Sequence, residues 1–297
     1  MINFRAVTIA DKEKVNAVLK LSDFRAAEYS FANIFNWSKA FNTEIAFFEG
    51  FLLNRGGGER KSYIYPAGAG NLQAAITALI EDAALLEQPL VLRTVQAEGK
   101  QLLEQLFPGR FHFILLRNTF DYIYHSEDLI NLSGKKFQPK RNLISRFNKN
   151  FEWHYEAIAA GNLQECVRMN EEWCRKYACH ENSSLRAETC AVRRALNYFS
   201  DESLSGGLLR VGGKVIAYTV GEQTSSDTFT VHIEKAFGEE FPGAYQVINY
   251  EFARRHAAHL KYINREDDTG DEGLRKAKLS YRPAFMVEKY NAELITA

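Results

Sequence analysis

The sequence predicts an α+β protein of two tandem domains, each built on a mixed α/β sheet flanked by helices. Three observations support this fold class. The composition, with 46% hydrophobic and 25% charged residues, is typical of a packed globular protein. The length of 297 residues suffices for two domains of ordinary size. The same order of strands and helices also occurs twice, with corresponding elements roughly 160 to 170 residues apart.

The second half shows this order most clearly. Asn162 precedes an apolar helical pattern and has Glu165 in capping-box spacing. Gly212 and Gly213 form the turn of a hairpin. In chain order, the predicted elements are a strand at 152–156, a helix from 162, a helix around 192–199, a hairpin at 208–211 and 215–220, a strand at 228–234, a helix from 242, a strand at 260–264, a helix at 272–280 and a strand at 284–290.

The first half has a similar succession of elements, although its residues are not visibly similar to those of the second half. The clearest helix of the chain follows Asn71, which is a good N-cap residue. We expect a first domain at 1–134, a basic connecting segment at 135–150 and a second domain at 151–297. In chain order, the predicted elements are a strand at 3–5, a helix from 11, an aromatic segment at 31–37, a hairpin at 44–48 and 51–54, a strand at 62–65, a helix from 71, a strand at 90–94, a helix through 102–106 and strands near 111–116 and 121–124.

This order of elements resembles that of the GNAT acyltransferase superfamily, and two segments carry a more specific resemblance. One runs from Asp121 to Phe147 and includes Leu132-Ser-Gly-Lys-Lys-Phe-Gln-Pro-Lys-Arg-Asn; the other begins Ile263-Asn-Arg-Glu-Asp-Asp-Thr-Gly-Asp. Both are similar to a tandem family likened to the C-terminal domain of phosphatidylglycerol lysyltransferases and, more distantly, to the Fem peptidyltransferases. The resemblance covers essentially the whole chain. It implies two tandem GNAT (acyl-CoA N-acyltransferase)-like domains, and transfer of an aminoacyl group from charged tRNA to an amine or a hydroxyl.

Acyl transfer to an amine requires a neutral amine, an aligned carbonyl and hydrogen-bond donors for the oxyanion. The resemblance implies that the backbone of the strand at 228–234 supplies the oxyanion donor, and that the phosphates of the donor bind before the next helix. Enzymes that use coenzyme A have a basic, glycine-rich loop there. This chain has Gly238 and Gly243 but also Glu239 and Glu240, which would repel a pyrophosphate. The departure favours a donor other than acyl-CoA.

Three residues of the second half are candidate catalytic groups. Glu234 would act as a general base or bind the amine. Its alternative role is that of a solvated carboxylate paired with Lys235 or Lys214. Lys278 would stabilise the carbonyl oxygen or a phosphate, and Tyr281 would donate a proton to the leaving oxygen. We expect Lys278→Ala to abolish transfer and to leave the melting temperature nearly unchanged.

A charged cluster follows the predicted strand at 260–264. Arg265, Asp267 and Asp268 are candidate substrate-binding residues, because carboxylates at a strand end would hold a cationic amine. The alternative is that these acids, and the bases that follow them, only complement the dipole of the helix at 272–280.

The connecting segment contains six Lys and Arg residues, has interleaved Phe residues, and lacks any acid between Asp128 and Glu152. Such a segment would follow a phosphate backbone while its aromatic rings stack on bases, which makes tRNA a candidate partner. The alternatives are a solvated helix face and a cover for the domain seam. The candidate substrate-binding residues of this segment are Lys135, Lys136, Lys140, Arg141 and Asn142.

Neither metal nor membrane binding is indicated. Cys174, Cys179 and His180 do not have the spacing of a structural zinc site, so we expect no metal. The formal net charge is zero, so the whole protein has no field that would attract nucleic acid or membrane. Without a predicted leader or membrane-spanning stretch, we expect a cytoplasmic protein with no integral membrane association and no disulfide framework.

These observations lead to the hypothesis of an acyl- or aminoacyltransferase with its active site in the second domain. We expect no firmly bound cofactor, with acyl-CoA or aminoacyl-tRNA as the donor substrate and a small-molecule or peptide amine as the acceptor. An alternative from another class is a non-catalytic RNA-binding or adaptor module that retains the fold. A third interpretation, lipid modification at a membrane surface, follows from the lysyltransferase resemblance, but the neutral net charge argues against it.

Overall fold

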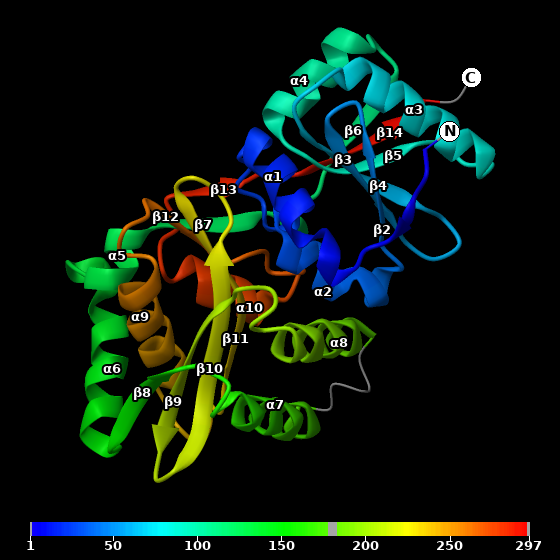
Figure 1. The fold of residues 1–297 in the computed structure, drawn as a ribbon. Helices are drawn as coiled ribbons and strands as arrows, with labels where there is room; N and C mark the ends of the chain where they lie inside the picture. The colour runs from blue at the N-terminus through cyan, green and yellow to red at the C-terminus, as the bar shows by residue number, and fades with distance from the viewer. Residues whose placement is uncertain (1, 178–182, 296–297) are drawn as a thin grey trace. The chain divides into compact units, whose positions relative to one another are not determined.

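Two seven-stranded sheets organise the protein in a computed structural model that describes residues 2–177 and 183–295 (Figure 1). The chain divides into two compact units. Unit 1 consists of Met1–Asp121, Asp267–Asp271 and Met286–Ala297, and unit 2 consists of Tyr122–Glu266 and Glu272–Phe285.

The first sheet has the strand order β1-β2-β3-β4-β5-β14-β6. Its strands are β1 (Arg5–Ala6), β2 (Glu44–Phe48), β3 (Phe51–Gly56), β4 (Ser62–Gly68), β5 (Val91–Val95), β6 (Phe111–Leu115) and β14 (Tyr290–Leu294). The accompanying helices are α1 (Lys12–Ser22), α2 (Phe31–Phe41), α3 (Leu72–Leu85) and α4 (Ala97–Leu106), with 3-10 turns at Ile9–Asp11, Ala27–Tyr29 and Arg117–Thr119. Helix α3 begins as predicted, because the Asn71 side chain accepts a hydrogen bond from the Ala74 amide at 3.0 Å.

The second sheet has the strand order β13-β7-β12-β11-β10-β9-β8. Its strands are β7 (Asp121–His125), β8 (Trp153–Ala157), β9 (Ser205–Val211), β10 (Lys214–Gln223), β11 (Thr228–Ala236), β12 (Tyr262–Asn264) and β13 (Phe285–Val287). The helices are α5 (Ser126–Asn131), α6 (Gln138–Asn150), α7 (Leu163–Lys176), α8 (Ser183–Asn197), α9 (Ala244–His256) and α10 (Glu272–Leu279), with a 3-10 turn at Lys135–Phe137. The predicted hairpin turn is confirmed, since Gly212 and Gly213 both have positive φ, at 55° and 81°.

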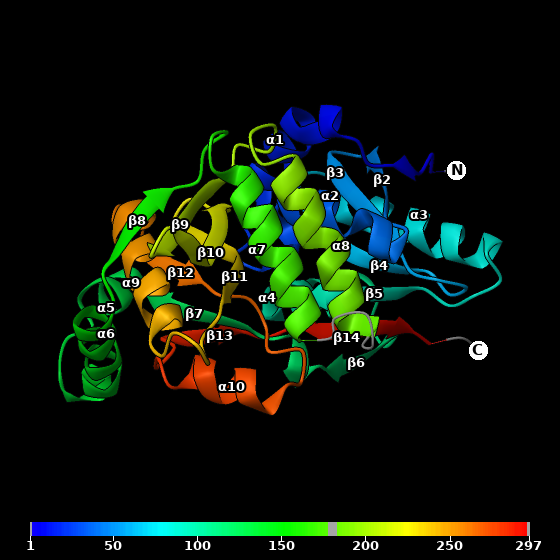
Figure 2. The ribbon, with the colours of Figure 1, turned by 90° about the horizontal axis from the view of Figure 1, so that it is seen from below.

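Helices cover both faces of the second sheet (Figures 1 and 2). Ala217 of β10 packs in a core with Phe147 of α6 and Ile248 of α9. The next residue, Tyr218, points to the opposite face, where its hydroxyl donates to Asn170 Oδ1 of α7 at 2.8 Å. Helices α6 and α9 therefore lie on one face, and α7 lies on the other.

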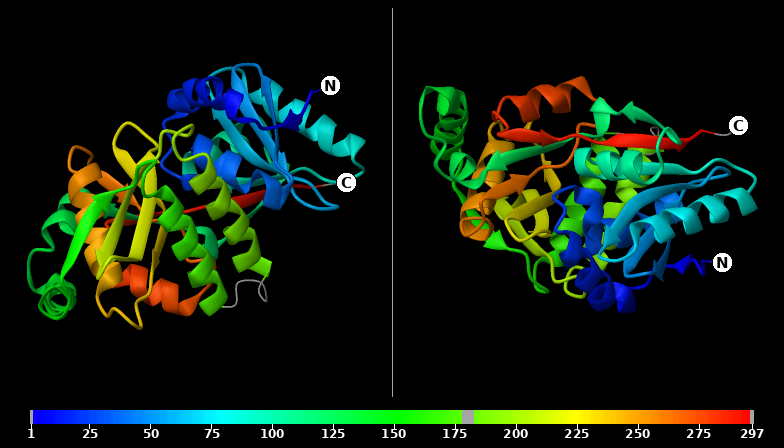
Figure 3. Two further views of the ribbon diagram at one scale, coloured as in Figure 1. Left: turned by 60° about the horizontal axis from the view of Figure 1, so that its bottom comes forward. Right: turned by 90° about the horizontal axis from the view of Figure 1, so that it is seen from above.

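Two strands belong to a different sheet from the one that their position in the chain predicts. β7, expected as the last strand of the first domain, pairs with β12 in the second sheet, where Tyr124 lies opposite Ile263. The expected single strand at 284–290 is divided, because β14 lies between β5 and β6 in the first sheet (Figures 2 and 3). Tyr124 and Ala292 are completely buried, as central strands require.

This exchange changes the expected domain boundaries of 1–134, 135–150 and 151–297. Residues 122–150 are part of unit 2, and residues 286–297 return to unit 1. The physical reason is that a short apolar strand can be recognised from its own residues, whereas the sheet that it joins depends on partners far away in the chain.

Candidate functional site

The two parallel strands at the centre of unit 2 diverge at their carboxyl ends. β11 and β12 pair at only three positions, Thr228 with Tyr262, Phe229 with Ile263 and Thr230 with Asn264. β12 then ends, whereas β11 continues for six more residues to Ala236. We call the region formed by residues 231–236 of β11 and residues 265–266 after β12 the unit 2 splay. Beyond Thr230, no strand among the described residues pairs with this side of β11.

A β-bulge lies in the splay. On the β10 side, Val220 is paired with Ile233 and Gly221 with Val231, so that His232 is an extra residue in β11. A bulge interrupts the regular ladder and redirects the backbone groups beside it. The expected source of the oxyanion donor, the strand at 228–234, therefore contains an irregular backbone segment.

Glu234 forms an ion pair inside the splay. Its Oε1 accepts from Arg265 Nη2 at 2.8 Å, and its Oε2 accepts from Asn249 Nδ2 of α9 at 3.0 Å. The side chains of Glu234 and Arg265 are only 13% and 12% exposed, so water screens the pair weakly. Lys235 and Lys214, the alternative partners, pair with other carboxylates instead. The interpretation of Glu234 as a solvated carboxylate is therefore wrong.

Aromatic rings surround Arg265. Its guanidinium carbon lies 4.8 Å from the ring centroid of Tyr281 and 5.9 Å from that of Tyr124. The Nη1 atom of Arg265 is buried and makes no hydrogen bond of good geometry among the described residues. Native proteins rarely leave a buried guanidinium nitrogen without an acceptor, so this donor is available to a bound group.

Lys140 of α6 extends to the same tyrosine. Its Nζ donates to Ser280 Oγ at 2.6 Å and lies 3.9 Å from the ring centroid of Tyr281. Burial, together with the positive charge of Arg265 and in spite of the negative charge of Glu234, lowers the pKa of Lys140 to about 8. The Lys140 amine is therefore partly neutral at slightly alkaline pH.

Tyr281 and Lys278 are held in place by their surroundings. Burial raises the pKa of the Tyr281 hydroxyl, so this group keeps its proton and remains able to donate it. The Lys278 ammonium is buried and donates to the carbonyl oxygen of Arg265 at 2.6 Å. The hydroxyl of Tyr124 donates to the Lys278 carbonyl at 2.8 Å. Lys278 thus anchors the backbone that carries Arg265, and we now expect Lys278→Ala to lower the melting temperature, contrary to the sequence-based expectation.

His232 is a site residue that the sequence did not suggest. Its Nδ1 lies 2.8 Å from Glu266 Oε1, and its Nε2 lies 3.2 Å from Glu222 Oε1. Burial by itself would lower the pKa of His232, but the hydrogen bonds and charges of the two carboxylates outweigh it and raise the pKa to about 10. His232 is therefore a cation between two anions at neutral pH. The feature of the sequence that could have identified His232 as a site residue is its position on a predicted strand, two residues before Glu234.

The two aspartates of the predicted charged cluster belong to unit 1. Asp268 is buried, with its Oδ2 3.3 Å from Arg117 Nη1 and its Oδ1 accepting from the Gly270 amide at 2.9 Å. Asp267 Oδ1 accepts from the Thr269 amide at 3.3 Å. Both residues shape the turn before α10. Their role in amine recognition stays a prediction, whereas Arg265 is a member of the unit 2 splay.

Most of the basic connecting segment forms helix α6, which packs within unit 2. Phe147 is completely buried in the core of that unit. Gly243, at the start of α9, has φ of 104°, and a Cβ atom there would lie 2.8 Å from the Leu143 carbonyl oxygen. The backbones of α6 and α9 therefore approach each other closely where glycine stands. This packing explains why Lys140 points into the protein.

The other predicted ligands of this segment make local contacts. Lys136 pairs with Asp128 at 3.0 Å. Arg141 donates to two backbone carbonyls just before the helix, and Asn142 accepts a hydrogen bond from within the same helix. Lys135 is exposed. The segment thus does not present its cations as one continuous outward row, which is what a track for a phosphate backbone would require.

Two amides in the loop before α9 donate to carbonyls of the loop itself. The Phe241 amide donates to the Phe237 carbonyl at 2.9 Å, and the Ala244 amide donates to the Phe241 carbonyl at 3.0 Å. Glu239 and Glu240 form ion pairs with a lysine of α7. A pyrophosphate would need such amides to be free and the acids to be absent.

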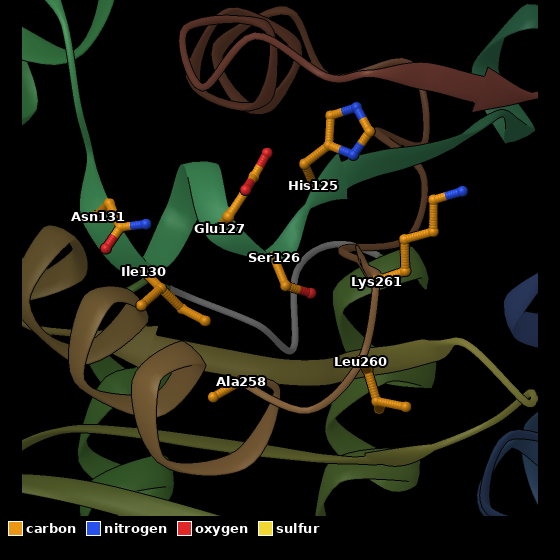
Figure 4. A pocket seen from close by; sticks show the side chains of 8 residues that line it. All are labelled: His125, Ser126, Glu127, Ile130, Asn131, Ala258, Leu260 and Lys261. Carbon is orange, nitrogen blue, oxygen red and sulfur yellow. The ribbon is translucent and has the colours of Figure 1, made fainter.

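A separate pocket lies before the amino end of β12, with a cavity volume of about 530 Å³ (Figure 4). Figure 4 shows side chains from α5 and from the segment between α9 and β12 around it. None of its lining residues is a predicted site residue. They are His125, Ser126, Glu127, Ile130, Asn131, Ala258, Leu260 and Lys261.

Within residues 2–177 and 183–295, no group of three or more His, Cys, Asp or Glu residues could hold a metal ion. Cys166, Cys174 and Cys190 are free thiols. Cys179 and His180, which the sequence analysis considered as ligands, lie outside the described residues. In the same described part of the chain, no helix has the length and apolar character needed to cross a membrane.

Comparison with known proteins adds the family. A family model described as phosphatidylglycerol lysyltransferase, C-terminal, matches residues 19–293. The chain belongs to this family. A conserved protein of unknown function from Bacteroides thetaiotaomicron VPI-5482 is 41% identical, and its crystal structure has a TM-score of 0.95 over 99% of this chain and 100% of that one. An uncharacterized protein of Mycoplasmoides gallisepticum is 25% identical over 190 residues, or 61% of this chain, and the match spans 58% of that relative.

More distant structures confirm the predicted fold class. The C-terminal domain of a protein assigned as a lysylphosphatidylglycerol synthetase from Agrobacterium fabrum has a TM-score of 0.68 at 14% identity, over 97% of this chain and 93% of that one. FemX has a TM-score of 0.52 at 10% identity over 97% and 96% of the two chains. A tandem GNAT protein from the clavulanic acid pathway has a TM-score of 0.51 at 10% identity over 100% of both. The chain thus has two GNAT-like domains, and family and fold together support a transferase in general.

Proposed function

We propose that unit 2 is an aminoacyltransferase that moves an aminoacyl group from a charged tRNA to an amine or hydroxyl acceptor. The observation that carries this proposal is the buried Glu234–Arg265 pair, which lies with Lys140 and Tyr281 at the splay of β11 and β12. Strand divergence, an adjacent bulge and buried charges together supply what acyl transfer requires, namely space for a carbonyl and preorganised polar groups around it.

In the proposed reaction, the acceptor nitrogen or oxygen attacks the carbonyl carbon of the aminoacyl ester. A bond forms between these two atoms, and the ester bond to the ribose oxygen breaks. The proton lost by the acceptor ends on the ribose hydroxyl. Backbone amides beside the His232 bulge would stabilise the oxyanion, and the Tyr281 hydroxyl would donate the proton to the leaving oxygen.

Glu234 has a more specific role in this scheme than a free general base. Both of its oxygens already accept hydrogen bonds, from Arg265 and Asn249. Its carboxylate therefore orients Arg265 towards the ring of Tyr281. The amine of the substrate would lie nearer to Glu222 and Glu266, whose two negative charges exceed the single positive charge of His232.

The choice of donor rests on the loop before α9. The acids Glu239 and Glu240 argue against a pyrophosphate there, and hence against acyl-CoA. The family description names a lysyltransferase, which agrees with an aminoacyl donor. An aminoacyl-tRNA donor would also require the cytoplasmic location that the sequence predicts.

The alternative of a non-catalytic RNA-binding module receives less support, because it gives no role to the buried Glu234–Arg265 pair. A transfer assay separates the two. Purified protein is incubated with bulk tRNA carrying labelled amino acids, and with a lysine-containing peptide, spermidine or phosphatidylglycerol vesicles as acceptor. Label that leaves tRNA and appears in an alkali-stable amide, or in lipid, supports the proposal. Binding of tRNA without any loss of label would support the alternative.

A further inference from the structure

Charge in the unit 2 splay is unevenly distributed. Lys140 and Arg265 both lie within 5 Å of the ring centroid of Tyr281, at 3.9 Å and 4.8 Å. Glu234 is the carboxylate that acts on both, and it forms its ion pair with Arg265. Lys140 has no carboxylate partner within ion-pair distance among the described residues. The Tyr281 end of the splay therefore carries an excess positive charge in a poorly hydrated surrounding, which is unfavourable unless an anion compensates it.

Hydrogen-bond donors are also left over at this end. An ammonium has three donors, and Lys140 uses one of them on Ser280 Oγ. Arg265 Nη1 is buried without an acceptor of good geometry in the described part of the chain. Donors of buried cations that the protein itself does not satisfy are suited to bind an anionic acceptor.

Negative charge predominates at His232, two residues before Glu234 on β11. There His232 lies between Glu222 and Glu266, so the cation is outnumbered by carboxylates. The splay thus has a negative end at His232 and a positive end at Tyr281. A ligand that carries a cation and an anion would match both ends, whereas a neutral ligand would match neither.

We propose that Lys140 and Arg265 form a subsite for an anionic group of the substrate, a phosphate or a carboxylate, that binds beside Tyr281. This inference rests on the proposed function, because it describes a substrate of the same site. It restricts that substrate to a molecule with an anion close to the reacting amine or ester. Arg265 would contribute charge and its free Nη1, and Lys140 would contribute its two unused donors.

The subsite couples anion binding to proton uptake. The groups that set the charge state of Lys140 are Arg265 from the loop after β12 and Glu234 from β11, with Ser280 and Tyr281 in direct contact. A bound anion favours the charged form of the amine and so raises the pKa of Lys140 from about 8. Near pH 8 the protein should therefore take up about half a proton for each anion bound, and near pH 6 almost none.

Isothermal titration calorimetry of the full chain tests both the anion subsite and the proton uptake that accompanies binding. Inorganic phosphate in one series and succinate in the other are titrated at pH 8 and at pH 6, each in two buffers with different ionisation enthalpies. We expect binding of one of them and, relative to Lys140→Met, which reports the ionisation of the anion itself, proton uptake at pH 8 only. Which of the two binds distinguishes a phosphate subsite from a carboxylate subsite. Lys140→Met should remove the uptake and weaken binding by roughly tenfold or more. Lys149→Met, which removes an exposed charge from the same helix, should leave both unchanged.

Equal affinity of wild type and Lys140→Met, equal weakening by Lys149→Met, or no binding of either anion at about 50 mM would overturn the subsite. Thermal unfolding of each variant shows whether it is folded, so loss of binding by misfolding is recognised. The assay contains no aminoacyl donor. Transfer is measured separately, in the labelled-tRNA assay. Anion binding with proton uptake in the calorimeter but no transfer in that assay would support the subsite and refute the transferase. Transfer without anion binding would support the transferase and refute the subsite.

Discussion

The two units share a strand arrangement but fill the equivalent region differently. In unit 1, β4 and β5 are parallel and pair at Tyr63 with Leu92 and at Ile64 with Arg93, as β11 and β12 do in unit 2. Beyond these pairs, the Tyr29 hydroxyl lies 3.1 Å from the Tyr65 carbonyl oxygen and 3.2 Å from that of Thr94. One buried tyrosine thus joins the two strands where the strands of unit 2 leave room for Arg265 and Glu234.

The β-bulges of the two units also differ, in whether the residue there has an amide hydrogen. In unit 1, Leu52 is paired with Ala67 and Asn54 with Ile64, which places Pro66 in the irregular segment of β4. Proline has no amide hydrogen and is tolerated in a sheet mainly at such positions. His232 is the extra residue in unit 2 and has an amide. The fold can therefore offer an oxyanion donor at this place in unit 2, while unit 1 lacks one at Pro66.

This difference teaches that the fold alone does not make an active site. Unit 1 uses the divergence of its strands as a packed core, and unit 2 keeps buried charges there, which are unfavourable for stability. Substitutions in unit 1 should consequently change stability alone, and substitutions in unit 2 should change transfer.

The largest effect is expected for Arg265→Met. Transfer should fall by about 1000-fold, because the positive charge beside Tyr281 is lost. The free energy of unfolding should fall by about 3–5 kcal/mol, since Glu234 remains buried without its partner. Urea denaturation and the labelled-tRNA assay measure the two effects. Adding Glu234→Gln should recover most of the stability and none of the transfer, and recovered transfer would contradict the assignment of Arg265.

Lys289→Met removes a buried positive charge from unit 1 and is the counterpart there of Arg265→Met. Lys289 Nζ lies 2.7 Å from both Asp121 Oδ1 and Glu28 Oε2, and Asp121 is 1% exposed. Leaving Asp121 buried without this cation should destabilise the protein by about 3–5 kcal/mol. Transfer per folded molecule should not change. The measurement is specific activity corrected for the folded fraction from circular dichroism, and a loss of corrected activity would give unit 1 a part in the reaction.

Lys140→Met should stabilise the protein at pH 7 by about 1–3 kcal/mol, because a buried charge is replaced by an apolar chain. The folded-state pKa of Lys140, about 8, lies below the ordinary value of 10.5. Below pH 8 both states hold the proton and the folded state bears the full burial penalty. As pH rises from 8 to 10.5 the folded state loses the proton first, so wild-type stability increases relative to the variant. Urea midpoints at pH 7 and 10 test this; a difference that is independent of pH would contradict it.

The smallest effect is expected for Tyr29→Phe, which removes the hydroxyl that joins β4 and β5. Two buried carbonyl oxygens lose the single hydroxyl hydrogen that they share, so the protein should be less stable by about 1–2 kcal/mol. Transfer should be unchanged. Tyr281→Phe is the matched variant in unit 2, and it should reduce transfer at a similar loss of stability. Equal activity of the two variants would remove the functional difference between the units.

Local patterns in the sequence predicted most elements and their order. Asn71 and the Gly212–Gly213 turn acted as expected, because caps and tight turns depend on a few adjacent residues. The predicted capping box failed. Asn162 instead accepts a hydrogen bond from the Ala159 amide, and Glu165 binds Arg210, a residue far away in the chain. A long-range ion pair overrode the local pattern.

The candidate site shows the same limit. Glu234, Arg265, Tyr281 and Lys140 were all named from the sequence, but their mutual contacts were not. Lys140 reaches Ser280 across 140 residues, and it was grouped with an RNA-binding segment because its neighbours are basic. Which lysine of a basic helix points inward depends on the close approach of α6 to Gly243, and nothing near Lys140 in the sequence encodes that approach.

The most direct test of the account is a comparison of transfer by three proteins: wild type, the Arg265→Met and Glu234→Gln double variant, and Tyr29→Phe. Each is supplied with labelled aminoacyl-tRNA and the same set of acceptors, and the rate is expressed per folded molecule. The account predicts that wild type and Tyr29→Phe move the label equally and that the double variant does not. Equal rates for all three, or loss of transfer in Tyr29→Phe alone, would contradict the claim that the unit 2 splay is the active site.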